Sequence, residues 1–293
     1  MAATPSPGMR VARGPHALEV GHARGPVLRY DADPRYRPHV HPLYAPGTDS
    51  PLTRRLPADH PWQVGAYVGL NDVNGQDFWC CGHAYYPPET RGSVRSASLS
   101  AEERGGGVEL AAEHDWLDAA GRPLARERQV WHVHPPAADG HAIDVRFELH
   151  ALAEPLRIGR YDYGGLAVRL VGDLATRRVL DSEGRRDAPD ANWERARWVA
   201  MAQPVDGVGA YVRGAPDLLA YAYAGVAILD HPGNGPAPAL WRVDGSLLNP
   251  SPQRDGPLEA AAGESVGFAY RLVVFLGDCD GERIEEEYRR WAG

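Results

Sequence analysis

Alternation of apolar and polar residues recurs along most of the chain, and it constrains the fold more than any other feature. In residues 124–134, Val130 and His132 fall on one face of an extended segment, and Trp131 and Val133 fall on the other. Similar runs, separated by Gly, Pro, Asn and Asp, occupy residues 17–20, 27–30, 92–98, 107–114, 142–153, 160–170, 196–201, 225–229 and 266–276. Many short strands with almost no helix predict an all-β fold, an antiparallel sandwich or barrel, in one domain over residues 1–293.

One helix is expected, at the end of the chain. Ile284, Tyr288 and Trp291 follow the i, i+4, i+7 spacing of a single helical face within residues 280–291. Residues 173–194 are polar and charged, which predicts a surface loop, and the first 15 residues are expected to be flexible.

Charge and composition exclude several partners. A formal net charge of −8 argues against nucleic acid and anionic membranes, which both attract a basic face. The sequence has no run of ~18 apolar residues to span a membrane, and its first residues lack the apolar core of a secretory signal. Three cysteines, two of them adjacent, make a poor disulfide framework. We therefore expect a cytoplasmic protein with a small-molecule substrate; the sequence leaves a homodimer open.

Residues 56–79 combine dense polar chemistry with limited backbone freedom. Asp59, His60, Trp62, Gln63 and Trp79 lie in this stretch among several prolines and glycines. Polar groups on a stiff, non-helical segment are typical of a functional loop. We expect this stretch to line the functional cleft.

The trio Asp-His-Pro occurs twice, at residues 59–61 and 230–232. His60 and His231 are candidate general acids or bases, with Asp59 and Asp230 orienting their rings. The hypothesis is that the two turns converge on one cleft. The alternative is two rigid corners in which each aspartate caps its turn.

His39 and His41 alternate on an extended segment and should face the same way. Such a pair can bind zinc, copper or iron when a third ligand arrives from elsewhere, the candidates being His60, His132, His134 and His231. No signature spacing supports a metal, so no cofactor is predicted and a divalent metal stays open. Without a metal, His41 is expected to contact substrate.

Further candidates come from the central strands and from polar turns. Glu127 beside Arg128 can set a pKa or hold an acidic substrate, or it can be a structural ion pair. Tyr163 precedes a Gly-Gly turn, where its phenol can donate to an oxyanion or belong to the core. Other expected substrate contacts are the aromatic walls Trp62, Trp79 and Trp241 and the polar residues Gln63, Asn234, Arg242 and Asn249.

An ordered set of motifs resembles the PmoA-like family, a bacterial family of unknown function often labelled "methane oxygenase". The motifs lie at residues 42–47, 59–61, 74–79, 163–166, 229–234 and 249–250. The resemblance implies a large β-sandwich similar to the galactose-mutarotase supersandwich, and an association with sugar catabolism. A membrane-bound copper oxygenase is excluded because the chain has no spanning segment.

The chain departs from that family's pattern at two motifs. The family usually reads Asp-His-Pro-His-His-x-Gly where Trp62 and Gln63 stand here, and Trp-His-Val-Arg where residues 241–244 read Trp-Arg-Val-Asp. The loss of three imidazoles suggests a diverged, specialised enzyme.

Three functions follow from these observations. The first is an enzyme, an isomerase, lyase or hydrolase, that uses acid–base chemistry on a carbohydrate-like or other small polyoxygenated metabolite. The second is a tailoring enzyme for a secondary metabolite, such as a cyclase. The third is a non-catalytic sugar-binding module, which the missing histidines favour.

Overall fold

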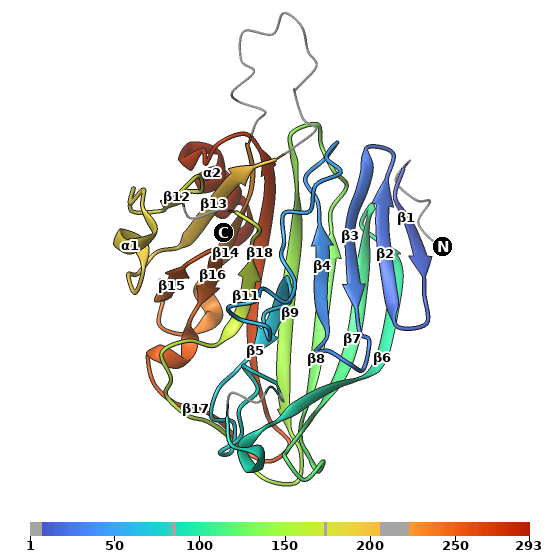
Figure 1. The fold of residues 1–293 in the computed structure, drawn as a ribbon, viewed down its shortest axis with the longest axis vertical. Coiled ribbons are helices and arrows are strands. Elements are labelled where there is room, and N and C mark those ends of the chain that lie inside the picture. Colours follow the sequence, from blue (N-terminus) through green and yellow to red (C-terminus); the bar gives the residue numbers. More distant parts are fainter. Residues whose placement is uncertain (1–7, 82, 84–85, 173–174, 206–222) are drawn as a thin grey trace, which may run out of the picture.

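The computed structural model describes residues 8–81, 83, 86–172, 175–205 and 223–293. In these residues, two eight-stranded antiparallel sheets pack face to face as a sandwich (Figure 1). The first sheet has the strand order β1 (Arg10–Arg13), β2 (Ala17–His22), β3 (Gly25–Asp31), β4 (His39–Leu43), β5 (Ala66–Gly69), β11 (Gly165–Arg169), β16 (Leu247–Pro250), β15 (Trp241–Asp244). The second has the order β12 (Arg178–Asp181), β13 (Trp198–Pro204), β14 (Tyr223–Asp230), β18 (Ser265–Leu276), β9 (Gly140–Ala151), β8 (Pro123–Val133), β7 (Gly107–Leu117), β6 (Ser93–Arg104).

Smaller elements complete the fold. Strands β10 (Leu156–Ile158) and β17 (Leu258–Ala260) form a two-stranded sheet. The helices are α1 (Ala188–Ala191) and α2 (Gly281–Ala292), and single 3-10 turns are η1 (Pro88–Thr90), η2 (Pro232–Asn234) and η3 (Pro252–Arg254). In the described residues, no helix has the length and apolar character needed to cross a membrane.

The predicted all-β sandwich with a short C-terminal helix is confirmed. Two local predictions were wrong. The segment predicted as a surface loop, residues 173–194, contains β12 and α1, apart from residues 173–174, which lie outside the described residues. Residues 10–13, expected to be flexible, pair with β2 as strand β1; residues 1–7 are not described.

Alternation places one face of each sheet inside the sandwich. On β5, Ala66 and Val68 enter the core between the sheets, whereas Tyr67 belongs to a separate cluster on the outer face. On β18, Leu272 and Val274 enter the core, whereas Phe275 points outward toward α2. Because the side-chain period is two, the side of a strand on which a residue acts follows from its parity.

A ladder of hydrogen bonds runs through the otherwise apolar core. The Tyr30 hydroxyl on the first sheet donates to Gln129 Oε1 on the second at 2.9 Å. Gln129 Nε2 donates to Glu127 Oε1 at 2.8 Å, and the Trp116 indole donates to Glu127 Oε2 at 2.9 Å. The Trp131 indole also donates to Gln129 Oε1 at 2.9 Å. Burial raises the pKa of Glu127 to about 7, although the bonds from Trp116 and Gln129 oppose the rise.

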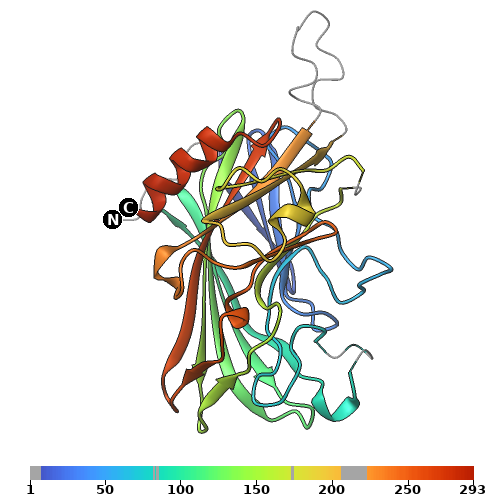
Figure 2. The same ribbon diagram turned by 90° about the vertical axis from the view of Figure 1, so that its left-hand side faces the viewer.

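Helix α2 covers part of the outer face of the second sheet (Figure 2). Ile284 packs there against Trp198 and Phe275. The Asp280 side chain accepts hydrogen bonds from the backbone N–H groups of Glu282 and Arg283, which caps the first turn. The predicted apolar stripe of this helix therefore marks the side that packs on the sheet.

Glu127→Gln tests the titration of the core. The folded-state pKa of Glu127 lies above its ordinary value of 4.5, so this group holds its proton longer when folded, and its contribution to stability is lost as the pH rises from about 5 to above 7. Between pH 5 and pH 8, the free energy of unfolding of the unsubstituted protein should fall by about 3 kcal/mol relative to that of the variant. Exposed Glu148→Gln is the control; parallel pH curves for Glu127→Gln and the unsubstituted protein would refute the prediction.

Candidate functional site

Two rows of side chains cross the outer face of the first sheet, where β4, β5, β11, β16 and β15 lie side by side (Figure 1). In one row, His41 lies beside Gly65, and the backbone N–H of Arg169 donates to the Gly65 carbonyl at 2.8 Å. Arg169 pairs with Leu247, and Leu247 pairs with Asp244. Polar side chains from strands distant in sequence therefore share one face.

The second row lies two residues further along these strands, on the same face. Tyr67 pairs with Ala167 across β5 and β11, and Asn249 pairs with Arg242 across β16 and β15. The Arg242 guanidinium stacks over the ring of Tyr163 at 4.2 Å. Its Nη2 also lies 3.0 Å from Asp244 Oδ2. This side of the site thus combines cationic and aromatic groups.

A tight loop presents Asp59 and His60 above these rows. The backbone N–H of Leu56 donates to the Gln63 carbonyl at 2.9 Å, and that of His60 donates to the Pro57 carbonyl at 3.0 Å. Asp59 Oδ2 accepts from His60 Nδ1 at 2.8 Å and from Arg169 Nη2 at 3.2 Å. The bond from His60, followed by the charge of Arg169, holds the pKa of Asp59 below its ordinary value, against the effect of burial. The loop therefore fixes an ionised carboxylate behind the imidazole.

Trp62 packs against this pair, and further aromatic rings continue the same outer-face cluster. Trp62 lies edge-on to His60, with ring centroids 5.3 Å apart, and its other side approaches His83 at 6.1 Å. Trp79 packs against Tyr67 and Tyr163 with centroids 5.5 and 4.8 Å apart, but it is itself buried. Trp62 and Tyr163 are thus the ring faces closest to the polar groups, and Trp79 supports them from below.

His39 and His41 share the outer face, as the alternation predicts. His39 Nδ1 contacts the Arg37 carbonyl at 2.8 Å, and His41 Nδ1 contacts Thr53 Oγ1 at 3.0 Å. Burial lowers the pKa of each imidazole to about 4, so both rings are neutral at pH 7. The hypothesis that they form a metal site finds no third ligand: the residues placed in the structure include no group of three His, Cys, Asp or Glu side chains arranged for a metal.

Buried polar atoms without hydrogen-bond partners gather on this face. Within the described ranges, they include His39 Nε2, both ends of the Gln63 amide, the Tyr67 hydroxyl, Arg169 Nε and Arg177 Nη1. Gln63 and Tyr67 are each only 1% exposed. A buried polar group without a partner costs stability, so a concentration of them indicates a place that binds something.

The second Asp-His-Pro turn lies on the other side of the sandwich, which overturns the hypothesis of one shared cleft. The His231 ring packs against Trp291 of α2 at 5.1 Å, on the outer face of the second sheet, and its Nδ1 accepts from the backbone N–H of Gly233 at 3.0 Å. Asn234 Nδ2 donates to Asp230 Oδ1 at 2.8 Å and to the Ala269 carbonyl at 2.7 Å. Burial raises the pKa of Asp230 to about 6. The Asp230, His231 and Asn234 side chains thus hold a structural turn, as the alternative interpretation states.

Glu127 and Arg128 do not form the expected pair. They occupy opposite faces of β8: Glu127 accepts its hydrogen bonds inside the core, whereas Arg128 points outward. Arg128 lines a separate hollow of about 520 Å³ on the second sheet, with His132 and Arg146. Neither residue reaches the site on the first sheet.

Two other expected substrate contacts are fully buried. Trp241 faces the core, and its indole donates to the Ala196 carbonyl at 2.7 Å. Asn249 lies under the outer face, where its amide donates to the carbonyls of Gly164 at 3.0 Å and Leu166 at 2.7 Å. They shape the strands but expose no group to a ligand.

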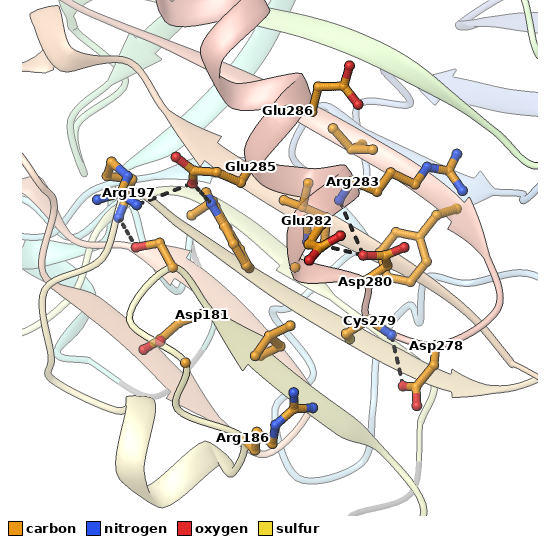
Figure 3. Close-up of a pocket in the computed structure, with 18 of the residues that line it drawn as sticks. Asp181, Arg186, Arg197, Asp278, Cys279, Asp280, Glu282, Arg283, Glu285 and Glu286 are labelled. Atoms are coloured by element: carbon orange, nitrogen blue, oxygen red, sulfur yellow. Dashed lines mark hydrogen bonds and ion pairs between the residues drawn. The ribbon is translucent and has the colours of Figure 1, made fainter.

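A cavity of about 1310 Å³ forms a groove between α2 and strands β12 and β13 (Figure 3). Its polar groups mainly bind one another: Arg197 Nη2 lies 3.2 Å from Glu285 Oε2, which also accepts from the Trp198 indole at 2.9 Å. The residues that line the groove supply none of the unpartnered buried polar atoms found in the described part of the chain. These contacts hold α2 against the second sheet. The outer face of the first sheet is therefore the better candidate for a ligand site.

The sequence analysis did not single out Tyr67, Arg169 and Arg177. Tyr67 and Arg169 sit in short apolar strands, where they look like core residues. Their parity was the available signal, since each alternates with residues that enter the core, Ala66 and Val68 for Tyr67 and Val168 for Arg169. Arg177 lies in the charged segment that was expected to be a loop.

The fold is a mostly antiparallel β-sandwich, and the polar, arginine-rich candidate site lies on one of its outer faces. The chain belongs to a family of unknown function, DUF6807, whose model matches residues 17–289. This finding corrects the resemblance to the PmoA-like family, because the comparisons give no match to that family.

No curated protein matches the chain. Among solved structures, it is similar to a TPR-domain containing protein from Parabacteroides distasonis ATCC 8503, with 10% identity and a TM-score of 0.32. The match covers 91% of this chain and 48% of that one, so the chain spans about half the length of that protein.

Replacing Gln63 tests whether the site is held at a cost to stability. Gln63→Met keeps the length of the side chain and removes the amide, which has no hydrogen-bond partner among the described residues. The melting temperature of the ligand-free protein should rise, by an amount equivalent to about 1–3 kcal/mol of unfolding free energy. Differential scanning calorimetry measures this, and a fall in melting temperature would contradict it.

Proposed function

We propose that the protein is an enzyme that moves protons on a small, polyoxygenated, carbohydrate-like metabolite at the outer face of the first sheet. The observation that carries the proposal is the contact of one Asp59 oxygen with both His60 Nδ1, at 2.8 Å, and Arg169 Nη2, at 3.2 Å. A carboxylate can only accept, so it holds the proton of His60 on Nδ1 and leaves Nε2 free to act as a base. Isomerases, lyases and some hydrolases use such a group.

The surroundings of His60 suit a sugar-like substrate. Trp62 lies edge-on to the imidazole at 5.3 Å and provides a ring beside which a pyranose can pack. Gln63, Tyr163 and Arg242 supply amide, phenol and guanidinium groups for hydroxyl or carboxyl oxygens. The His60 side chain is 33% exposed, so a ligand can reach it.

A non-catalytic sugar-binding module is the second candidate. The unpartnered polar atoms on this face support it, since they require a ligand but no reaction. We also propose a cytoplasmic location, supported by the free state of Cys80, Cys81 and Cys279.

Proton transfer can be measured without knowing the natural substrate. The protein would be incubated in D₂O with a panel of sugars, sugar acids and keto-sugars, and incorporation of deuterium at carbon would be followed by ¹H NMR. For an active ligand, we expect His60→Asn to slow exchange by about 10²–10⁴-fold, since it removes the base. The matched control is His231→Asn, the same residue in the other Asp-His-Pro turn, which should exchange at the normal rate.

Two results would reject the enzyme. Equal exchange in His60→Asn and the unsubstituted protein would remove His60 from the chemistry. A panel member that raises the melting temperature but is neither exchanged nor converted would favour the binding module instead.

A further inference from the structure

The proposed site holds more guanidinium groups than carboxylates. Arg169, Arg177 and Arg242 lie around it, and the Arg37 guanidinium lies 4.7 Å from the centroid of the Tyr67 ring. In the described residues, the acidic neighbours of the first three are Asp59 and Asp244, so positive charge remains without a counter-ion. Because the guanidinium groups are largely removed from water, this excess attracts an anion strongly.

Arg169 is the most deeply buried of the three. It is only 8% exposed, and its one ion pair uses Nη2 and the half-exposed Asp59. Its Nε has no hydrogen-bond partner within the residues that the structure places. A buried guanidinium with an unused donor costs stability unless a ligand supplies the acceptor.

Arg177 repeats this arrangement nearby. Its Nη1 is buried and has no acceptor in the described ranges. Burial lowers the pKa of Arg177; the charge of Asp244 opposes the change, and that of Arg169 adds to it. The Arg177 Cβ lies beside Gly172, three residues after Arg169 at the end of β11. The two like charges therefore lie on neighbouring parts of this face, and an anion bound there would offset them.

The Tyr67 hydroxyl adds a neutral donor. It is buried on the same face, again without a partner in the part of the chain that is described. Burial raises the pKa of Tyr67, while the charges of Arg37, Arg242 and Arg169 oppose the rise. The phenol thus keeps its proton near a cluster of positive charge and can donate it in a hydrogen bond to an anion.

We propose that Arg169, Arg177 and the Tyr67 hydroxyl form a subsite for a carboxylate, so that the substrate is an acidic sugar or a related sugar acid. This inference rests on the proposed function, because it names the substrate class of the same site. A carboxylate supplies the negative charge that the site lacks, and its two oxygens suit the planar donors of arginine.

The test compares an acidic probe with its neutral counterpart. Binding of D-glucuronate, D-glucose and inorganic phosphate would be measured by calorimetric titration. Arg177→Gln should raise the Kd for glucuronate about 10- to 100-fold, the effect of losing a hydrogen bond to a charged group. Tyr67→Phe should raise it about 5- to 10-fold. Neither variant should change the Kd for glucose.

Two comparisons show whether a loss of glucuronate affinity comes from this site or from a loss of folding or of general positive charge. Tyr67→Phe removes a hydroxyl that bonds to nothing in the described structure, so the ligand-free variant should melt no lower than the unsubstituted protein. Arg146→Gln removes an arginine from the outer face of the second sheet and should bind glucuronate normally. A loss of affinity in the first variant with no loss in the second assigns the effect to this site.

Several outcomes would overturn the inference. They are the absence of glucuronate binding, equal affinity for glucose and glucuronate, and normal glucuronate binding by Arg177→Gln and Tyr67→Phe. Phosphate that binds more tightly than glucuronate with the same dependence on Arg177 would overturn the carboxylate assignment.

Deuterium exchange on a neutral sugar that depends on His60 but not on Arg177 or Tyr67 would defeat this inference and leave the proposed function standing. Glucuronate that binds with the expected dependence on Arg177 and Tyr67, but without deuterium exchange, would reject the proposed proton transfer and leave the carboxylate subsite standing.

Discussion

The burial of one face of every strand between the two sheets is the constraint on which the rest of the structure depends. It forces a strict choice at each position, because a residue on a strand either enters the core or faces outward. Glu127 and Arg128 illustrate the choice: they are adjacent in sequence, yet one bonds inside the core and the other lines a hollow on the outer surface. The strand residues that contribute to a site on one outer face must therefore occupy alternate positions along their strands.

Buried polar groups are hydrogen-bonded along the central ladder of the core, whereas several on the outer face of the first sheet are not. In the core, Glu127 receives donors from Trp116 and Gln129, and Tyr30 extends the ladder to the first sheet, so these buried polar groups stabilise the pairing of the sheets. On the outer face, Gln63, Tyr67 and Arg169 are equally buried but retain atoms without partners in the described residues. Unpartnered atoms also occur elsewhere in the described residues, at His114 Nδ1 and both ring nitrogens of His141, so it is their concentration on the outer face that supports a binding role.

Sequence alone predicted much of the fold, because the period of two survives in the long strands. The sequence-based prediction failed where that pattern is short. Strand β12 lies in a charged segment and contributes only Val179 and Leu180 to buried clusters, which is too few apolar residues to indicate a strand. For the candidate site, Asp59, His60 and Gln63 stand out in the sequence because they lie close together in it. The prediction that His231 shares a cleft with His60 was wrong, because a local Asp-His-Pro motif does not determine which sheet its turn packs against. Arg169 was missed because a single charge among apolar residues reads as strand interior.

The Asp59 turn connects the candidate base His60 to the arginine cluster on the first sheet. Backbone bonds close the loop over residues 56–63, and Arg169 anchors its carboxylate from the neighbouring strand β11. The imidazole is therefore oriented before any ligand arrives, which reduces the ordering cost of binding. The same guanidinium connects the turn to the cluster that includes Arg177 and Tyr67. An anion held there would be placed relative to His60 through a single shared residue, so the geometry of binding and that of proton transfer are coupled by Arg169.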